Sequence, residues 1–260
     1  MKRIFIFIIS LIFCMNIEGA EKKIKLATLA WEPYIGPELE KNGPVAEIIR
    51  QALKFEGYQL ELVFMPWARA MAESEKASDG IDGCMPKYYD ESIGNIFEFS
   101  EPFFESHVGF IGNKKNNKEI NYIYDKDDLN KTYDKLNNLS FGIVRGYFNE
   151  EKFDKRNDLK KIDVTTDEMN MSNLINKKVD LIFIDNFVFK YLLRKNYKLN
   201  ISPADFTMLN PPIKVHKLYI IFSKKAVDYK EKLKSFNLGM KKLSKEKKLG
   251  KIIREFEDFR

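Results

Sequence analysis

The chain has 260 residues, 44% of them hydrophobic, which suits one large α/β domain or two lobes that each bury a core. Its formal charge of +6 comes from 44 basic and 38 acidic residues that are interspersed along the chain. No basic run carries the interleaved aromatic residues that bind nucleic acid, so we expect a solvated lysine-rich surface and no nucleic-acid partner.

Residues 1–20 have the three parts of a secretory signal peptide. A basic start precedes an apolar run at 4–13 and an exit with the small residues Gly19 and Ala20. The apolar run is too short to cross a bilayer, which takes about 20 residues of helix. Glu18 is an unfavourable residue for signal-peptide cleavage after Ala20, so the exact cleavage site stays open.

A lipoprotein anchored at Cys14 is the competing interpretation, but the residue before such a cysteine is normally small and here it is Phe13. We therefore expect a periplasmic or extracytoplasmic protein without lipidation at Cys14. Removal of the leader leaves Cys84 as the one thiol, so no internal disulfide can form. Because His107 and His216 lack zinc-like spacing and no CxxC occurs, we expect no metal and no cofactor.

The first half of the mature chain alternates predicted strands and helices. Residues 24–29 form a predicted strand, and a helix begins at about Pro44, where proline suits the first turn. Apolar alternation predicts a strand at 58–64, which a helix at 67–76 and a short strand at 81–85 follow. The order strand, helix, strand, helix, strand predicts a parallel sheet with helices on its faces.

The second half repeats this order after a strand at 107–111 and a polar, linker-like stretch at 113–137. A strand at 139–144 follows, and Thr165 and Glu168 form a predicted capping box before a helix. The later predicted elements are a buried strand at 179–184, a helix after it, a strand at 218–222 and two basic amphipathic helices. The two halves are thus similar α/β units.

Several local sequences occur in the order and spacing of a known family. They are Trp31-Glu32-Pro33-Tyr34, Gly43-Pro44-Val45-Ala46-Glu47-Ile48, Pro66-Trp67-Ala68-Arg69-Ala70, Gly80-Ile81-Asp82-Gly83, Phe99-Ser100-Glu101-Pro102-Phe103, Lys178-Val179-Asp180-Leu181-Ile182-Phe183-Ile184-Asp185 and Leu249-Gly250-Lys251-Ile252. Over essentially the whole mature chain, the sequence thereby resembles the bacterial extracellular solute-binding proteins of family 3, the polar amino acid type.

The resemblance implies an α/β fold of the two-lobed type II periplasmic binding kind. Each lobe would be a mostly parallel sheet flanked by helices, with the ligand cleft between the lobes. Residues 21–112 would form the first part of lobe one, 113–216 lobe two, and 217–260 the return segment and C-terminal helices of lobe one. Two crossing segments would make the hinge on which the lobes close.

Ligands of open α/β sheets bind outside the carboxyl ends of the strands, which directs attention to the residues just after each strand. Trp31 and Tyr34 follow the first strand and could form an aromatic wall or a cation–π partner, or could pack the loop on the core. Trp67 and Arg69 begin the helix after the second strand. Arg69 could clamp a carboxylate or pair with Glu73 on the helix surface.

Met85, Lys87 and Tyr88 follow the third strand, where the resemblance implies backbone hydrogen bonds to the ligand. The family's arginine that grips the α-carboxylate should lie seven residues before Ser100, but Ile93 stands there. Either another cation, namely Lys87, Arg69 or Arg145, takes the carboxylate, or the ligand is not a standard α-amino acid.

Three further residues complete the candidate ligand site. Arg145 ends the first strand of the second half, where it could join helix amides in binding an anion or lie on the surface. The resemblance implies that Asp185 accepts hydrogen bonds from the ligand's ammonium, while aspartate is also a favoured helix N-cap. Phe103 could face the cleft or pack in the core.

The expected function is binding, without catalysis, of a small polar solute such as an amino acid for an ABC-type importer, by a monomer. A sensory binder that feeds a receptor is the first alternative. The second is a dehydratase-like enzyme on the same fold, with Glu32, Asp185 and His107 as candidates for an acid–base pair. No recognisable catalytic sequence supports that second alternative.

Overall fold

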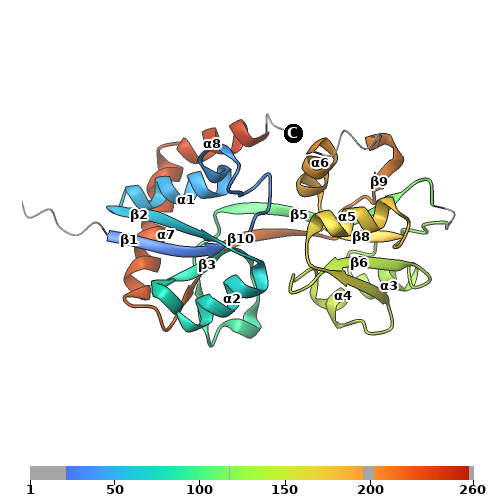
Figure 1. Cartoon of the computed structure of the whole chain (residues 1–260), viewed down its shortest axis with the longest axis horizontal. Coiled ribbons are helices and arrows are strands. Elements are labelled where there is room, and N and C mark those ends of the chain that lie inside the picture. Colours follow the sequence, from blue (N-terminus) through green and yellow to red (C-terminus); the bar gives the residue numbers. More distant parts are fainter. Residues whose placement is uncertain (1–21, 117, 196–201, 258–260) are drawn as a thin grey trace, which may run out of the picture.

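The computed structural model describes residues 22–116, 118–195 and 202–257. The predicted signal peptide and Cys14 lie outside this part of the chain. The helices and strands form two groups side by side along the long axis, and the long strands β5 (Phe104–Asn113) and β10 (Lys214–Ser223) run from one group into the other (Figure 1). Within the described ranges, none of the helices is long and apolar enough to cross a membrane.

The first group has parallel strands covered by helices, as the sequence predicts. Strand β1 pairs in parallel with both β2 and β3. The elements of this group are β1 (Lys22–Thr28), α1 (Pro44–Lys54), β2 (Tyr58–Phe64), α2 (Trp67–Lys76), β3 (Gly83–Tyr88), β4 (Phe97–Phe99), α7 (Tyr229–Lys245) and α8 (Lys248–Glu257).

The second group repeats this arrangement. Strand β6 pairs in parallel with both β7 and β8. The elements of this group are α3 (Leu129–Asp134), β6 (Ser140–Val144), α4 (Glu151–Lys155), β7 (Lys160–Val164), α5 (Asp167–Ile175), β8 (Leu181–Asp185), α6 (Asn186–Lys195) and β9 (Phe206–Met208).

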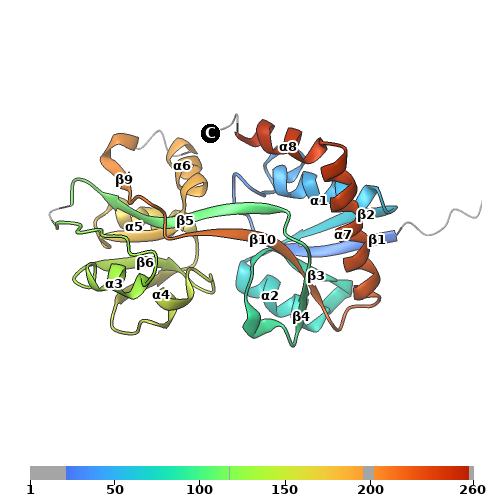
Figure 2. The same ribbon diagram turned by 180° about the vertical axis from the view of Figure 1, so that it is seen from behind.

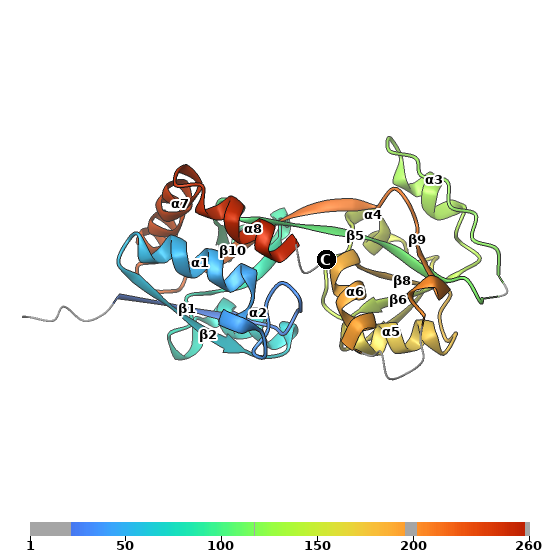
Figure 3. The same ribbon diagram turned by 90° about the horizontal axis from the view of Figure 1, so that it is seen from above.

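Strands β5 and β10 connect the two groups into one hydrogen-bonded sheet with the order β2-β1-β3-β10-β5-β8-β6-β7. The two strands pair antiparallel to each other from Lys214–Val108 to Leu218–Phe104. Figures 2 and 3 show them crossing the space between the groups. The α/β fold class is confirmed. The predicted lobe limits at residues 112 and 216 fall within these strands and stay predictions.

Several elements differ from the prediction. The strand expected at 81–85 runs from Gly83 to Tyr88, because it continues along β10 as far as the Leu218–Tyr88 pair. The capping prediction was wrong by one residue, since the hydroxyl oxygen of Thr166 accepts the amide hydrogen of Met169 at 3.2 Å. The short elements β4, α4, β7 and β9 were not predicted, because three to five residues show no clear periodicity.

The apolar face of α1 forms the centre of the first group's core. Its predicted inward residues are completely buried; they are Val45, Ile48, Ile49, Ala52 and Leu53. Helix α7 packs closely on this face at Gly239, where a Cβ atom would clash with the carbonyl oxygen of Ala52. By contrast, Gly250 in α8 has only the end of the flexible Arg254 side chain nearby, at 3.4 Å from an added Cβ.

These two helical glycines should respond to alanine in opposite directions. Gly239→Ala is expected to destabilise the fold by about 1–3 kcal/mol, because the added methyl forces α7 away from α1. Gly250→Ala is expected to be neutral or stabilising by up to about 1 kcal/mol, since alanine favours the helix. Urea unfolding of both variants measures this, and equal effects would contradict the close α1–α7 approach.

Candidate functional site

Two adjacent clefts lie between the groups, at the carboxyl ends of the strands. The aromatic slot is narrow, about 50 Å³, and is lined by Leu29, Trp31, Trp67, Pro86, Lys87, Tyr88, Tyr147 and Phe148. The polar cleft, about 600 Å³, shares Trp67, Lys87, Tyr147 and Phe148 with the slot. Because both groups contribute to the walls, a molecule held there would touch both.

The turn after β1 builds one wall of the slot. The backbone of Trp31 bonds to Ile35, with a 2.8 Å hydrogen bond from the Trp31 amide, which holds the turn closed. The rings of Trp31 and Tyr34 stack with centroids 4.4 Å apart, and Tyr88 meets the Trp31 ring edge-on at 6.3 Å. Such paired rings form a rigid apolar surface.

Lys87 brings the positive charge of the slot into an apolar setting. Its side chain is only 8% exposed, and its Nζ lies 3.7 Å from the Oδ2 of Asp90 and 5.5 Å from the ring centre of Phe148. Burial lowers the pKa of Lys87, and the nearby carboxylate of Asp90 partly offsets this effect. The charge of Asp154 adds to that of Asp90 in favouring the ammonium form of Lys87. A lysine in the wall of both clefts is suited to take a ligand anion.

The opposite wall comes from the loop after β6. Gly146 has φ +81°, a value that glycine adopts without strain, and Tyr147 and Phe148 follow it into the slot. The hydroxyl of Tyr147 donates to the Oδ2 of Asp167 at 3.2 Å. Burial raises the pKa of Asp167 to about 7, although the Tyr147 hydrogen bond lowers it somewhat.

Sequence reasoning missed Tyr147, Phe148 and Asp167, and stopped at Arg145 on this loop. The strand-end rule, carried three residues further along the loop, would have found the two aromatic residues. No local signal distinguishes Asp167 from an ordinary acidic residue in the first turn of a helix.

Asp185 joins the two groups of elements and is only 3% exposed. Its Oδ1 caps helix α6, accepting from the amides of Phe187 at 2.7 Å and Val188 at 3.1 Å. Its Oδ2 accepts from the hydroxyl of Tyr34 at 2.9 Å, the hydroxyl of Ser106 at 2.7 Å and the amide of His107 at 2.9 Å. The carboxylate therefore caps a helix and holds a tyrosine from the other group, and it lines neither cleft.

A polar chain continues from Asp185 through both long strands. The hydroxyls of Ser106 on β5 and Tyr88 on β3 lie 2.6 Å apart. The Tyr88 ring stacks on His216 of β10 at 4.1 Å, and the His216 Nε2 lies 2.8 Å from the carbonyl oxygen of Asn149. The rear of the slot is thus supported by hydrogen bonds and stacking between strands.

The buried imidazole predicts a pH dependence of stability. Burial lowers the pKa of His216 to about 4, whereas an unfolded histidine titrates near about 6.5. Between about pH 4 and pH 6.5, the unfolded chain therefore binds more protons at His216 than the folded protein does. The stability that the neutral imidazole contributes is present above about pH 6.5. It falls by about 3 kcal/mol as the pH is lowered to about 4.

His216→Phe isolates this contribution, because phenylalanine keeps a ring against Tyr88 and does not titrate. The difference in unfolding free energy between the wild type and the variant should shrink by about 3 kcal/mol from pH 7 to pH 4. Buried acids with a raised pKa, such as Asp167, change the unfolding free energy in the opposite direction between pH 7 and pH 4. Their contribution is the same in the wild type and in the variant, so it cancels when the two unfolding free energies are subtracted. A difference that does not change with pH would contradict the buried neutral state.

The other predicted residues lie in different settings. Arg145 is exposed at the edge of the polar cleft, where its Nε donates to the Oδ2 of Asp163 at 2.7 Å. Arg69 is exposed on α2 and lines neither cleft. Met85 is completely buried, and Phe103 packs edge-on against Phe236 of α7 at 6.2 Å, so both belong to the core.

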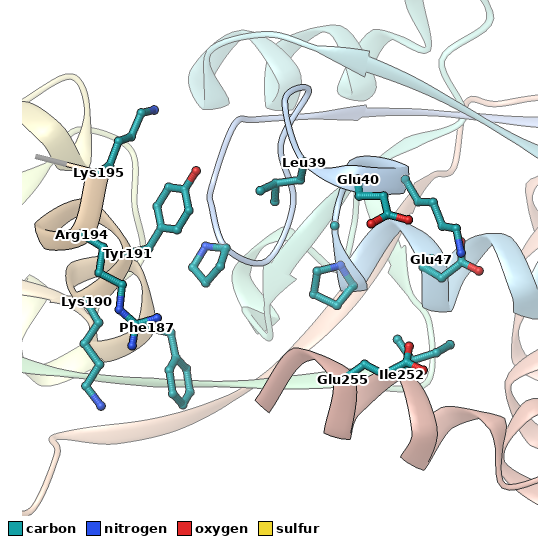
Figure 4. Close-up of a pocket in the computed structure, with 14 residues that line it drawn as sticks. Leu39, Glu40, Glu47, Phe187, Lys190, Tyr191, Arg194, Lys195, Ile252 and Glu255 are labelled. Atoms are coloured by element: carbon teal, nitrogen blue, oxygen red, sulfur yellow. The ribbon is translucent and has the colours of Figure 1, made fainter. Parts of the chain in front are cut away.

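A larger cleft of about 660 Å³, here called the outer cleft, lies between the two groups near α6 and α8. Figure 4 shows Lys190, Tyr191 and Arg194 of α6 on one side and Leu39 and Glu40 on the other. None of the residues predicted from the sequence lines it. We place the candidate site in the slot and the polar cleft, because these collect the strand-end residues and a buried lysine with a lowered pKa.

Solved structures are similar to this chain in fold at low sequence identity. No protein-family model and no curated protein matches it. A mutant of ArgBP from T. maritima superposes with a TM-score of 0.71 at 15% identity, covering 91% of this chain and 95% of that one. AbpA from Streptococcus pneumoniae, an amino acid ABC transporter substrate-binding protein bound to L-arginine, gives 0.70 at 16% identity, with 90% and 93% covered.

A histidine kinase sensor domain with similarity to periplasmic binding proteins gives a TM-score of 0.73 at 14% identity, covering 90% of this chain and 96% of that one. At such identities the likeness concerns the fold alone. The chain therefore has the fold of the type II periplasmic binding proteins, as the sequence resemblance implies.

Proposed function

We propose that the chain is an exported solute-binding protein that closes its two groups of elements on a small polar solute, an amino acid or a related compound, and passes it to an ABC-type importer. The observation that carries this proposal is the aromatic slot. Its walls come from both groups, and four residues predicted from strand ends, Trp31, Trp67, Lys87 and Tyr88, line it together.

Two further features support binding by closure. Strands β5 and β10 are the long sheet connections between the groups, and bending of two such strands is the simplest hinge available to this architecture. The polar cleft beside the slot has the volume of small-molecule sites, which is about 300–1,000 Å³. A solute could enter through this cleft and place its apolar part in the slot.

The arrangement of Asp185 argues against an enzyme. A general acid or base must reach the proton that it transfers, yet Asp185 accepts five hydrogen bonds from the protein and lines neither cleft. His107, the other candidate for an acid–base pair, contributes its backbone amide to these five hydrogen bonds.

A sensory role is the second candidate function. The kinase sensor domain has this fold with a TM-score of 0.73, so the same lobes can serve a receptor. Solute-dependent binding of the protein to either a purified permease or a receptor ectodomain would separate transport from sensing.

The two tryptophans allow a direct test, because they are the only ones in the chain and both line the slot. Titration with amino acids, polyamines, sugars and organic acids should change tryptophan emission for one class. The same class should stabilise the fold by about 2.7 kcal/mol at a free concentration of 100 times Kd. No response in emission or stability to any class would contradict the proposal, and turnover of the bound compound would favour an enzyme.

A further inference from the structure

Tyr34 belongs to the first group of elements but is buried against the second. It lies completely buried in the turn after β1, where its ring stacks on Trp31 at 4.4 Å. The same ring meets Phe187 of α6 edge-on at 6.2 Å, and its hydroxyl donates to the Oδ2 of Asp185 at 2.9 Å. One side chain therefore joins the slot wall after β1 to the end of β8 and the start of α6.

The acceptor of this hydrogen bond is fixed within the second group. The carboxylate of Asp185 also accepts from two amides at the start of α6. Its other described donors besides Tyr34 are Ser106 and His107, which lie on β5, and β5 pairs antiparallel with β8. Burial raises the pKa of Tyr34, so the hydroxyl keeps its proton and remains a donor at neutral pH. Tyr34 is thus the one described donor to Asp185 that comes from the turn after β1.

The slot has almost no free space while this hydrogen bond is in place. Its volume of about 50 Å³ holds at most a few water molecules, and it is far below the range of small-molecule sites, about 300–1,000 Å³. A solute group can enter only when the wall with Trp31 parts from the wall with Tyr147 and Phe148. Because Tyr34 is stacked on Trp31, we expect this parting to draw its hydroxyl away from Asp185.

A second contact across the slot is weaker than this hydrogen bond. The Nζ of Lys87 lies 5.5 Å from the ring centre of Phe148, close to the limit of about 6 Å for a cation–π interaction. A hydrogen bond to a carboxylate is about twice as strong as one between neutral groups. We therefore expect Tyr34 to contribute more than Lys87 to the free energy that holds the walls together.

We infer that the hydrogen bond between Tyr34 and Asp185 is a latch, which keeps the slot closed in the free protein and must break before a solute occupies the slot. This inference rests on the proposed solute-binding function and adds a regulatory contact to it. The apparent affinity for a ligand falls with the fraction of protein in the binding-competent form, so a weaker latch should give tighter binding. Tyr34 acts in this way although it lines neither cleft.

A thiol placed in the slot measures how often the latch opens. Leu29 lines the slot and is 9% exposed, so Leu29→Cys introduces a thiol that iodoacetamide reaches after the walls part. When opening and closing are faster than the reaction, the labelling rate is proportional to the open population. Adding Tyr34→Phe should raise this rate about tenfold or more, because a hydrogen bond to a buried carboxylate is lost while the ring remains.

The matched control is Tyr133→Phe in the same Leu29→Cys background. Tyr133 is completely buried, and its hydroxyl donates to the Oε2 of Glu150 at 2.8 Å inside the second group. This variant also loses a hydrogen bond to a buried carboxylate. The labelling rate in its slot should nevertheless stay that of the Leu29→Cys protein.

Cys84 reports exposure through unfolding of the whole protein. It is completely buried, and burial raises the pKa of its thiol to about 12, so it reacts slowly in the folded state. Peptide mass spectrometry distinguishes the two thiols, and the introduced thiol should react first. If both react at the same rate, Leu29→Cys has lost the fold. Val144→Cys, at a 2% exposed position in the wall of the polar cleft, then serves for the same comparison.

Two results would overturn the latch. One is an unchanged labelling rate after Tyr34→Phe. The other is an equal rise after Tyr34→Phe and Tyr133→Phe, since this would show a general loss of stability. The titration of tryptophan emission tests the proposed function independently, so a solute-binding protein without a latch is distinguished from a protein that binds none of the solutes.

Discussion

Replacing Lys87 with methionine should reduce ligand-induced stabilisation and leave the free protein at least as stable as the wild type. Methionine matches the length of the lysine stem, and the substitution removes a buried ammonium whose pKa is already lowered by burial. Loss of a charge-assisted hydrogen bond to the ligand should weaken binding by about 10- to 150-fold. Thermal unfolding with and without ligand measures both effects.

Lys232→Met is the matched control, because Lys232 is also largely buried and forms a 2.6 Å ion pair with Asp82, away from the clefts. Its removal leaves the 6% exposed carboxylate of Asp82 without this partner, so the free protein should lose stability. Ligand binding should persist. If Lys87→Met lowers the stability of the free protein and retains binding, Lys87 has a structural role only.

Replacing Asp185 with alanine should cost about 3–5 kcal/mol of stability, because it leaves several buried donors without an acceptor. The donors come from the cap of α6, from β5 and from Tyr34. For a chain of this length, such a loss corresponds to a Tm lowered by roughly 10 °C. Urea and thermal unfolding of the free protein measure it.

The control for Asp185→Ala is Asp128→Ala, which removes another N-cap aspartate. The Oδ1 of Asp128 accepts from the Asn130 amide at 3.2 Å at the start of α3, in a more exposed setting. Loss of this cap should cost about 1 kcal/mol. If the two variants lose equal stability, the contacts of Asp185 with Tyr34 and Ser106 contribute little.

The sequence alone was sufficient for the longer elements and for part of the site. Helix α2 spans the predicted residues, and the face of α1 is buried as its apolar spacing predicts, because helical periodicity records which side of a segment faces the core. Trp31, Trp67, Lys87 and Tyr88 were selected because parallel strands bring their carboxyl ends to one edge.

Only the tertiary structure decided which partner each side chain has. Tyr34 and Asp185 are 151 positions apart, and their hydrogen bond depends on how the two groups meet across β5 and β10. In the same way, Arg145 lies beside Asp163 on β7, a strand too short to be predicted. Local spacing determines backbone conformation and the buried side, whereas contacts between distant segments depend on the packing of the whole chain.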